Sequence, residues 1–164
     1  MGFFRIAKTF EVEYGHRLSK HPEKCRFPHG HSLRIEVVAR GRELNDQDMV
    51  CDYKALKMIV TDVVERLDHA MALNSSDPQL EGLAAIGDRV LLFDDCDPTT
   101  EVLARWIFEQ IGERLAARGT VQAPTGTNYE IPADLELERV RVWETSSSWG
   151  EYVGLELGIR NEEF

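Results

Sequence analysis

Two runs of alternating apolar and polar residues, 4–14 and 32–40, constrain the fold of this chain more than any other feature. Successive side chains of a β-strand point to opposite faces, so each run predicts a strand with one buried and one solvated face. Lys8 interrupts the first run, and Gly41 follows the second as a turn signal. We expect the two strands to pair antiparallel.

The pattern then changes to the 3.6-residue period of amphipathic helices. One helix is predicted from the capping residue Asp52 to about Leu67. Another is predicted in "DPTTEVLARWIFEQIGERL", with Asp97 as N-cap and Pro98 at the first helical position. Both helices have an apolar stripe, so both are expected to pack against the sheet.

Near the end of the sequence, "LERVRVWET" and "EYVGLELGI" alternate on either side of "SSSWG", which predicts a terminal hairpin. The order strand, strand, helix, helix, strand, strand predicts an α+β fold with helices on one face of an antiparallel sheet. Residues 74–96, with "RVLLF" as a candidate short strand, and the loop-like residues 118–136 fit this plan badly. We expect both segments to be excursions from the core.

A chain of 164 residues is expected to form a single domain, residues 1–164. The net charge of −10 argues against nucleic-acid binding through overall charge, although it permits an anionic small molecule in a locally basic cleft. No stretch approaches the ~18 consecutive apolar residues of a membrane span. Three widely spaced cysteines do not form a disulfide pattern, so we expect a soluble protein of the reducing cytoplasm.

Three of the five histidines fall where the first two strands meet. His16 has the parity of Tyr14, and His29 and His31 have the parity of Leu33, so all three point to the apolar face if the strands persist. An antiparallel hairpin brings these strand ends together. Three imidazoles with an open fourth position are typical of a catalytic Zn²⁺ site. The alternative is three separate histidines, each hydrogen-bonded or exposed.

Cys25 lies close to these histidines in the sequence, and two interpretations of it remain open. As a fourth ligand it would close a Cys/His₃ site and leave no position for substrate or water. As an unbound thiol beside a cation it would have a lowered pKa, and it could act as a base or nucleophile at neutral pH.

The motifs "FEVEYGHRL", "CRFPHGHS", "MVCDYKALK", "LDHAMALN", "DPTTEVLARWIFEQI" and "WET" occur in this order. Together they resemble the 6-pyruvoyltetrahydropterin synthase family over residues 4–74, 97–115 and 139–154. The spacing of three residues between Cys25 and His29 is most similar to the bacterial branch, the 6-carboxytetrahydropterin synthases of queuosine precursor biosynthesis.

The resemblance implies the tunnelling fold, in which antiparallel sheets of neighbouring subunits join into a barrel. It implies a homohexamer built as a dimer of trimers. It also implies a Zn²⁺ ion bound by His16, His29 and His31. The substrate would be 7,8-dihydroneopterin triphosphate, which loses triphosphate and, in the bacterial branch, acetaldehyde. Alternatives are a 6-pyruvoyltetrahydropterin synthase, which eliminates only triphosphate, and a pterin-binding zinc protein without turnover.

The resemblance further assigns proton abstraction to Cys25, a relay to Asp68 and His69, and the anchoring of the pterin to Glu144. Strand parity also places Glu144 on the apolar face, where an unpaired charge is costly unless a ligand supplies donors. The amino-pyrimidine edge of a pterin supplies such N–H donors. The alternatives are a Glu144 that faces solvent and an Asp68–His69 pair that is simply an exposed helix end.

Thr100 and Glu101 begin the second helix, where capping explains both residues. In the family this segment also lies near the pterin, so both are candidate substrate-binding residues. The loop between the strands is basic and could steer a triphosphate, although a solvated loop explains it as well. Its cations are Arg17, Lys20, Lys24 and Arg26. The long segments 75–96 and 116–138 depart from compact members of the family, so the loop geometry around the site is not predicted.

Overall fold

The computed structural model describes residues 2–85, 87–117 and 119–154. The chain runs through β1 (Phe4–His16), a short 3₁₀ turn (Lys24–Arg26), β2 (His29–Gly41), α1 (Tyr53–Glu65), β3 (Ala70–Asn74), α2 (Leu80–Ala84), β4 (Val90–Phe93), α3 (Thr100–Ala116), β5 (Gly119–Gln122), β6 (Asn128–Ile131), β7 (Glu136–Trp143) and β8 (Trp149–Val153). Within these ranges, no helix is long and apolar enough to cross a membrane.

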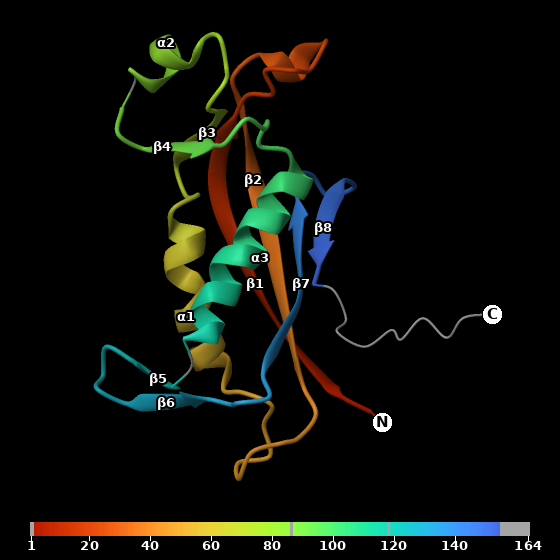
Figure 1. Ribbon diagram of the computed structural model, residues 1–164, viewed down its shortest axis with the longest axis vertical. Coiled ribbons are helices and arrows are strands. Elements are labelled where there is room, and N and C mark those ends of the chain that lie inside the picture. The colour runs from red at the N-terminus through yellow and green to blue at the C-terminus, as the bar shows by residue number, and fades with distance from the viewer. Residues whose placement is uncertain (1, 86, 118, 155–164) are drawn as a thin grey trace, which may run out of the picture.

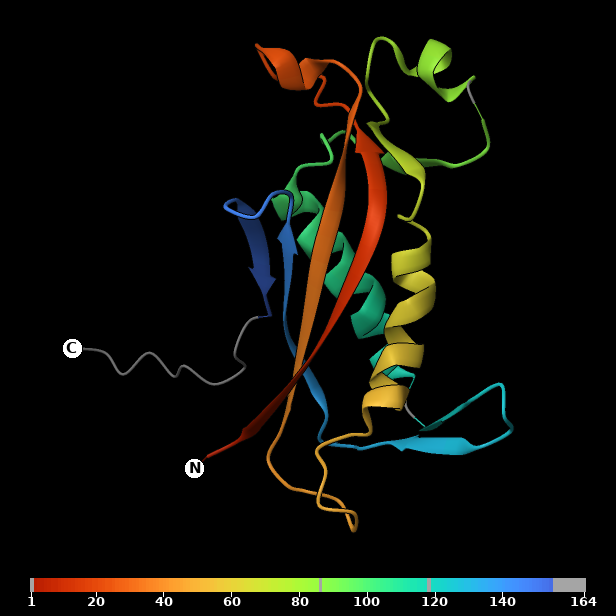
Figure 2. The same cartoon turned by 180° about the vertical axis from the view of Figure 1, so that it is seen from behind.

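A curved six-stranded sheet in the order β4-β3-β1-β2-β7-β8 forms the body of the molecule. Helices α1 and α3 pack on one face of this sheet (Figures 1 and 2). The pairs β1–β2, β2–β7 and β7–β8 are antiparallel, which confirms the predicted hairpins and the α+β class. The face that α1 and α3 cover is apolar because their inward stripes meet the alternating apolar residues of the strands.

The sheet is mostly antiparallel, as predicted, but two strand pairs at one edge are parallel. Strand β3 pairs parallel with β1, and β4 pairs parallel with β3. Helix α1 carries the chain back along the sheet, so the strand that follows it runs in the direction of β1 (Figure 1). Four of the five residues of β3, "AMALN", are buried, and its sequence is accordingly almost continuously apolar. It therefore lacks the alternation of apolar and polar residues that marks the other strands.

The two segments predicted as excursions contain regular structure. The candidate strand in "RVLLF" is confirmed as β4, so residues 74–96 contribute to the main sheet instead of leaving the core. Residues 118–136, predicted as a loop, include the antiparallel pair β5–β6, which forms a separate two-stranded sheet. Ile131 of β6 is buried, and this contact anchors the small sheet to the main core.

The predicted start of the first helix is confirmed, and that of the second is wrong. Asp52 caps α1, and its carboxylate accepts a hydrogen bond from the Lys54 backbone N–H at 2.7 Å. Helix α3 begins two residues later than expected, because Thr99, and not Asp97, accepts from the N–H of Val102. The Asp97 carboxylate is instead bound to other segments of the chain, as described below.

The terminal hairpin forms with a shorter turn than predicted. Strand β8 begins at Trp149, so the last two residues of "SSSWG" belong to the strand. Trp143 and Trp149 are register partners at the closed end of this hairpin. Residues 155–159 of the predicted strand lie outside the described residues.

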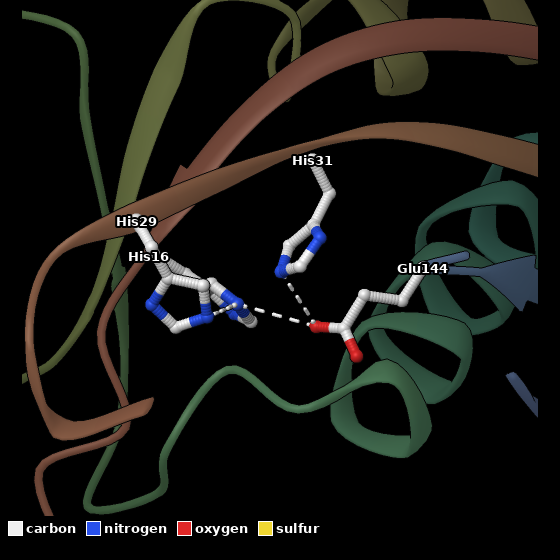
Figure 3. Close-up of side chains that lie close together, drawn as sticks. All are labelled: His16, His29, His31 and Glu144. Atoms are coloured by element: carbon white, nitrogen blue, oxygen red, sulfur yellow. Dashed lines mark hydrogen bonds and ion pairs between the residues drawn. The ribbon is translucent and has the colours of Figure 1, made fainter. Parts of the chain in front are cut away.

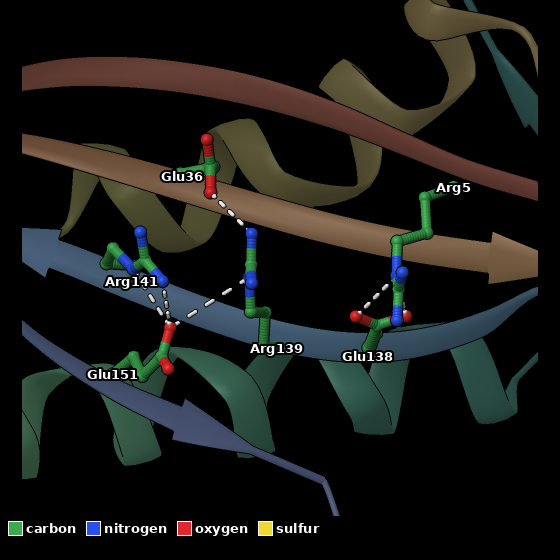
Figure 4. A network of polar contacts seen from close by, with 6 residues as sticks. All are labelled: Arg5, Glu36, Glu138, Arg139, Arg141 and Glu151. Atoms are coloured by element: carbon green, nitrogen blue, oxygen red, sulfur yellow. Dashed lines mark hydrogen bonds and ion pairs between the residues drawn. The ribbon is translucent and has the colours of Figure 1, made fainter.

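Charged side chains cover the sheet face that points away from α1 and α3 (Figure 4). Arg139 lies 3.2 Å from Glu36 and 3.9 Å from Glu151, so this guanidinium joins strands β2, β7 and β8. Arg141 binds Glu151 at 2.7 Å, which adds a second cation to the same carboxylate. The sheet therefore has one apolar and one ionic face, as the alternation predicts.

Candidate metal centre

The three predicted histidine ligands meet at one end of the sheet. His16 and His29 are register partners, and His31 pairs with Tyr14 two residues away. All three side chains point to the face that α1 and α3 cover, and the ring centroids lie 4.5–5.2 Å apart. His16 is almost completely buried, with 1 % of its surface exposed. The convergence predicted from strand parity is therefore confirmed.

Glu144 joins this group from the turn after β7 (Figure 3). Its Oε1 atom lies 3.2 Å from Nε2 of His16 and 3.2 Å from Nε2 of His31. One ligand atom from each histidine and one carboxylate oxygen all lie within 4.8 Å of one another. We call His16, His29, His31 and Glu144 the four-residue cluster. Its imidazole and carboxylate donors suit Zn²⁺ and similar divalent metals.

Backbone carbonyls orient two of the imidazoles. Nδ1 of His16 lies 2.9 Å from the Pro98 oxygen, and Nδ1 of His29 lies 2.8 Å from the Phe27 oxygen. A carbonyl oxygen only accepts hydrogen bonds, so Nδ1 carries the proton in both rings. Nε2 of His16 and Nε2 of His29 then face each other at 3.1 Å with their lone pairs. A cation at this position removes the repulsion, and the residues present therefore fit a metal ion.

A proton is the other cation that can meet this need. With Nε2 of His16 protonated, the ring donates to Glu144, and this hydrogen bond is the main reason that the pKa of Glu144 lies below its ordinary value. Burial lowers the pKa of His31, against the opposing effect of the Glu144 charge. Neutral His31 is the form that binds metal, so a metal ion and a proton compete for this ring nitrogen.

Cys25 does not belong to the four-residue cluster. It lies in the 3₁₀ turn before His29 and is partly buried. Its side chain makes no hydrogen bond with another described residue, while its carbonyl oxygen accepts from the Leu18 N–H at 3.0 Å. The chain thus brings three histidines together without a thiolate ligand.

Asp68 and His69 form a pair beside strand β1, outside the four-residue cluster. Nδ1 of His69 lies 3.0 Å from Oδ2 of Asp68, and Oδ1 of Asp68 accepts from the Glu13 N–H at 3.0 Å. The Glu13 hydrogen bond is the main cause of a lowered Asp68 pKa. His69 has φ +55°, in the left-handed region, and its side chain is 70 % exposed. It lines an open pocket of about 540 Å³ together with Ser32 and Arg89.

Thr100 and Glu101 lie in the first turn of α3, close to Glu144. The Thr100 hydroxyl donates to Glu101 at 3.2 Å. The pKa of Glu101 is lowered mainly by its own backbone N–H, while the charge of Glu144 acts in the opposite direction. A Cβ placed on Gly150 of β8 would meet the Thr100 Oγ1 atom at 2.9 Å, so helix and strand are in close contact here. The charge of Glu144 thus acts on Glu101, and Thr100 is its neighbour in the same helical turn.

Two of the four cations in the basic loop bind to other segments of the chain. Arg17 is buried, lies 3.3 Å from Asp77 and donates to Gln79. The ammonium group of Lys20 donates to the Asp95 carbonyl at 2.9 Å. These contacts bind the loop to the segments that follow β3 and β4, and they oppose the idea that the whole basic run is available to a triphosphate.

Sequence reasoning did not identify the contribution of residues 97 and 98 to the site. The sequence predicts Pro98 as the first helical residue, yet its carbonyl oxygen lies outside the helix and faces His16. The only available signal was an Asp-Pro-Thr series before a helix, which capping explains equally well.

Comparison with known proteins agrees with this geometry. A family model described as 6-pyruvoyl tetrahydropterin synthase matches residues 5–154. The 6-carboxy-5,6,7,8-tetrahydropterin synthase of Aquifex aeolicus is 27% identical, over 91% of this chain and 97% of that protein. A probable enzyme of the same name from Halobacterium salinarum is 34% identical, over 77% of this chain and 80% of that protein.

Solved structures support the same fold. An uncharacterized protein from Wolinella succinogenes has a TM-score of 0.73 at 21% identity, covering 94% of this chain and all of that one. The 6-pyruvoyl tetrahydropterin synthase of Caenorhabditis elegans has a TM-score of 0.60 at 21% identity, covering 94% of this chain and 98% of that one. With the family match over residues 5–154, these findings show that the chain belongs to the 6-pyruvoyl tetrahydropterin synthase family.

Proposed function

We propose that this chain is a zinc-dependent 6-carboxy-5,6,7,8-tetrahydropterin synthase. It would convert 7,8-dihydroneopterin triphosphate into 6-carboxy-5,6,7,8-tetrahydropterin, acetaldehyde and triphosphate. The observation that carries this proposal is the convergence of His16, His29 and His31 in a chain whose similar curated relatives have this name over almost their whole length. Three free cysteines fit a reducing compartment, and we place the enzyme in the cytoplasm.

The metal proposal assigns the three imidazoles of the four-residue cluster as the ligands of Zn²⁺. When bound, the ion would act as a Lewis acid toward the side-chain hydroxyls of the substrate. Glu144 would lie beside the ion, whose positive charge favours the ionised carboxylate. One carboxylate oxygen, Oε2, points away from the imidazoles and is the atom that we assign to the amino-pyrimidine edge of the pterin (Figure 3).

The remaining roles follow the family resemblance. Cys25 would remove a side-chain proton from the substrate, Asp68 and His69 would relay protons, and Thr100 and Glu101 would border the pterin. Support for Cys25 as a base is its position outside the ligand set, since a thiol that is not a ligand stays free to accept a proton. Support for the relay is the direct contact between Asp68 and His69, which holds the ring in one tautomer.

We also propose the homohexamer, as a dimer of trimers, as the working assembly. In the single chain neither Cys25 nor the Asp68–His69 pair belongs to the four-residue cluster. Light scattering of the purified protein measures the mass of the assembly directly, against 18.7 kDa for one chain.

Product identification tests the proposed reaction. Purified protein is incubated with 7,8-dihydroneopterin triphosphate, and pterins and acetaldehyde are measured with parent and Cys25→Ala proteins. The proposal expects acetaldehyde and the 6-carboxy product in equal amounts from the parent alone. The family model carries the name of the 6-pyruvoyl enzyme, so the rival result is a 6-pyruvoyl product without acetaldehyde. Pterin binding without any product would favour a carrier.

A further inference from the structure

Asp97 joins three segments of the chain that surround His16. Its Oδ1 accepts from the Ser19 hydroxyl at 2.6 Å and from the Asn74 amide at 3.1 Å. Its Oδ2 accepts from the Lys20 backbone N–H at 2.7 Å. Asn74 is 1 % exposed, so this contact lies in the interior. The carboxylate therefore ties the loop after β1 and the end of β3 to the segment that leads into α3.

The neighbour of Asp97 contacts a predicted metal ligand. The Pro98 carbonyl oxygen faces Nδ1 of His16 at 2.9 Å. On the far side of Pro98, the Thr99 N–H donates to the Asp97 carbonyl oxygen at 2.8 Å, and Thr99 caps α3. The proline ring restricts the backbone between these two residues. The position of the Pro98 oxygen is thus fixed by Asp97 before it and by the helix cap after it.

This arrangement determines which nitrogen of His16 faces the cluster. A proton held on Nδ1 by the Pro98 oxygen leaves the lone pair of Nε2 directed toward His29 and Glu144. If the oxygen moves, the ring loses the contact that selects this tautomer. We propose that Asp97 is a positioning residue for metal binding, acting through Pro98 on the tautomer and orientation of His16. The inference rests on the metal part of the proposed function.

Zinc affinity of suitable variants tests the inference. Asp97→Ala removes the hydrogen bonds from Ser19, Lys20 and Asn74. Asp94→Ala is the matched control, because Asp94 is exposed and, among the described residues, its side chain accepts only from Ser75, at 3.4 Å. Competition with a chromophoric chelator gives the zinc dissociation constant of each protein. We expect Asp97→Ala to bind zinc roughly 10-fold more weakly, as for other groups that support a metal ligand. The control should match the parent.

A second readout does not require metal. In the metal-free parent, nitrogen NMR of the histidine rings should report a proton on Nδ1 and none on Nε2 of His16 at a pH where the ring is neutral. In Asp97→Ala the two tautomers should mix, while the Asp94→Ala spectrum stays like the parent. If Asp97→Ala does not fold, Ser19→Ala removes only one of the hydrogen bonds to Asp97, together with a contact to Asn74 at 3.4 Å. It should shift both readouts in the same direction by less.

The outcomes separate this inference from the proposal on which it rests. Unchanged zinc affinity and an unchanged His16 tautomer in a folded Asp97→Ala protein overturn the positioning role. An equal loss in Asp94→Ala also overturns it, since the effect is then general to the loop. A parent that does not bind zinc refutes the metal proposal, while the NMR comparison still decides whether Asp97 controls His16.

Discussion

Nε2 of His16 lies 3.1 Å from Nε2 of His29, and each ring has its other nitrogen against a backbone carbonyl oxygen. Two neutral rings in this arrangement have no proton to share between them. The contact is stabilised only when a cation is present. The affinity of the site for a metal ion follows from this contact between His16 and His29.

The first prediction concerns metal removal. The purified parent should contain about one zinc ion per chain. Chelation should lower its melting temperature, because a ligand that binds only the folded state stabilises that state. A His29→Ala/His31→Ala protein should lack both zinc and the response to chelator, whereas His21→Ala should behave like the parent. Metal analysis and thermal unfolding check this, and equal zinc in parent and double variant would contradict it.

The second prediction concerns the thiol. Because Cys25 lies outside the four-residue cluster, Cys25→Ala should keep its zinc and lose turnover by ~10²-fold or more. Cys96→Ala is the matched control, since Cys96 is also a partly exposed free cysteine. Loss of zinc together with activity would make Cys25 a ligand and restore the closed-site interpretation.

The third prediction separates two roles of Glu144. If Glu144 anchors the pterin, Glu144→Gln should raise KM at least ~10-fold and lower kcat, because the reacting carbons are misplaced. Its zinc content should stay that of the parent. Glu136→Gln is the control, since Glu136 lies at the end of β7 opposite to Glu144 and 58% of its side chain is exposed. A Glu144→Gln protein that loses zinc would show that the carboxylate is a metal ligand instead.

The fourth prediction concerns acid stability. Burial tends to raise the pKa of Asp97, but hydrogen bonds from Ser19, Lys20 and Asn74 together hold it below its ordinary value of 3.8. Since the unfolded chain binds this proton more readily, the stabilisation is fully present above pH 3.8 and is lost as the pH falls through the lower folded-state pKa. The difference in melting temperature between parent and Asp97→Asn should therefore shrink from pH 6 to pH 2.5. A constant difference would contradict it.

The fifth prediction compares two glycines. Gly150→Ala should lower the free energy of unfolding by about 1–3 kcal/mol, since its Cβ would meet Thr100 Oγ1 at 2.9 Å and the Glu101 nitrogen at 3.1 Å. Gly82→Ala should be neutral or stabilise by up to ~1 kcal/mol, because Gly82 is helical and has nothing within 4 Å of the added Cβ. Chemical denaturation measures both, and equal effects would refute the close contact between β8 and α3.

Strand parity was enough to predict the histidine convergence, because period two leaves only one face for His16, His29 and His31 once β1 and β2 pair. The parity of Glu144 likewise predicted its direction. The parallel edge was not predictable in this way, since β3 is short and almost continuously apolar and carries no alternation to read.

Long-range hydrogen bonds to single side chains also could not be predicted from the sequence. Asp97 precedes a proline and a helix, and local capping was the natural interpretation. The partners that hold its carboxylate are 23 to 78 positions away along the chain. Only the folded structure shows that Asp97, predicted as a helix cap, connects β3 and the basic loop to the segment whose Pro98 carbonyl oxygen contacts His16.

The register of β1 and β2 runs unbroken from Phe4 and Gly41 to His16 and His29. A slip of one residue would turn His29 and His31 to the ionic face while His16 stayed among apolar side chains. The ion proposed for this site would then bind only when the hairpin has the observed register. Metal binding would therefore favour the observed pairing of β1 and β2 over a pairing shifted by one residue, even though such a shift replaces no ligand.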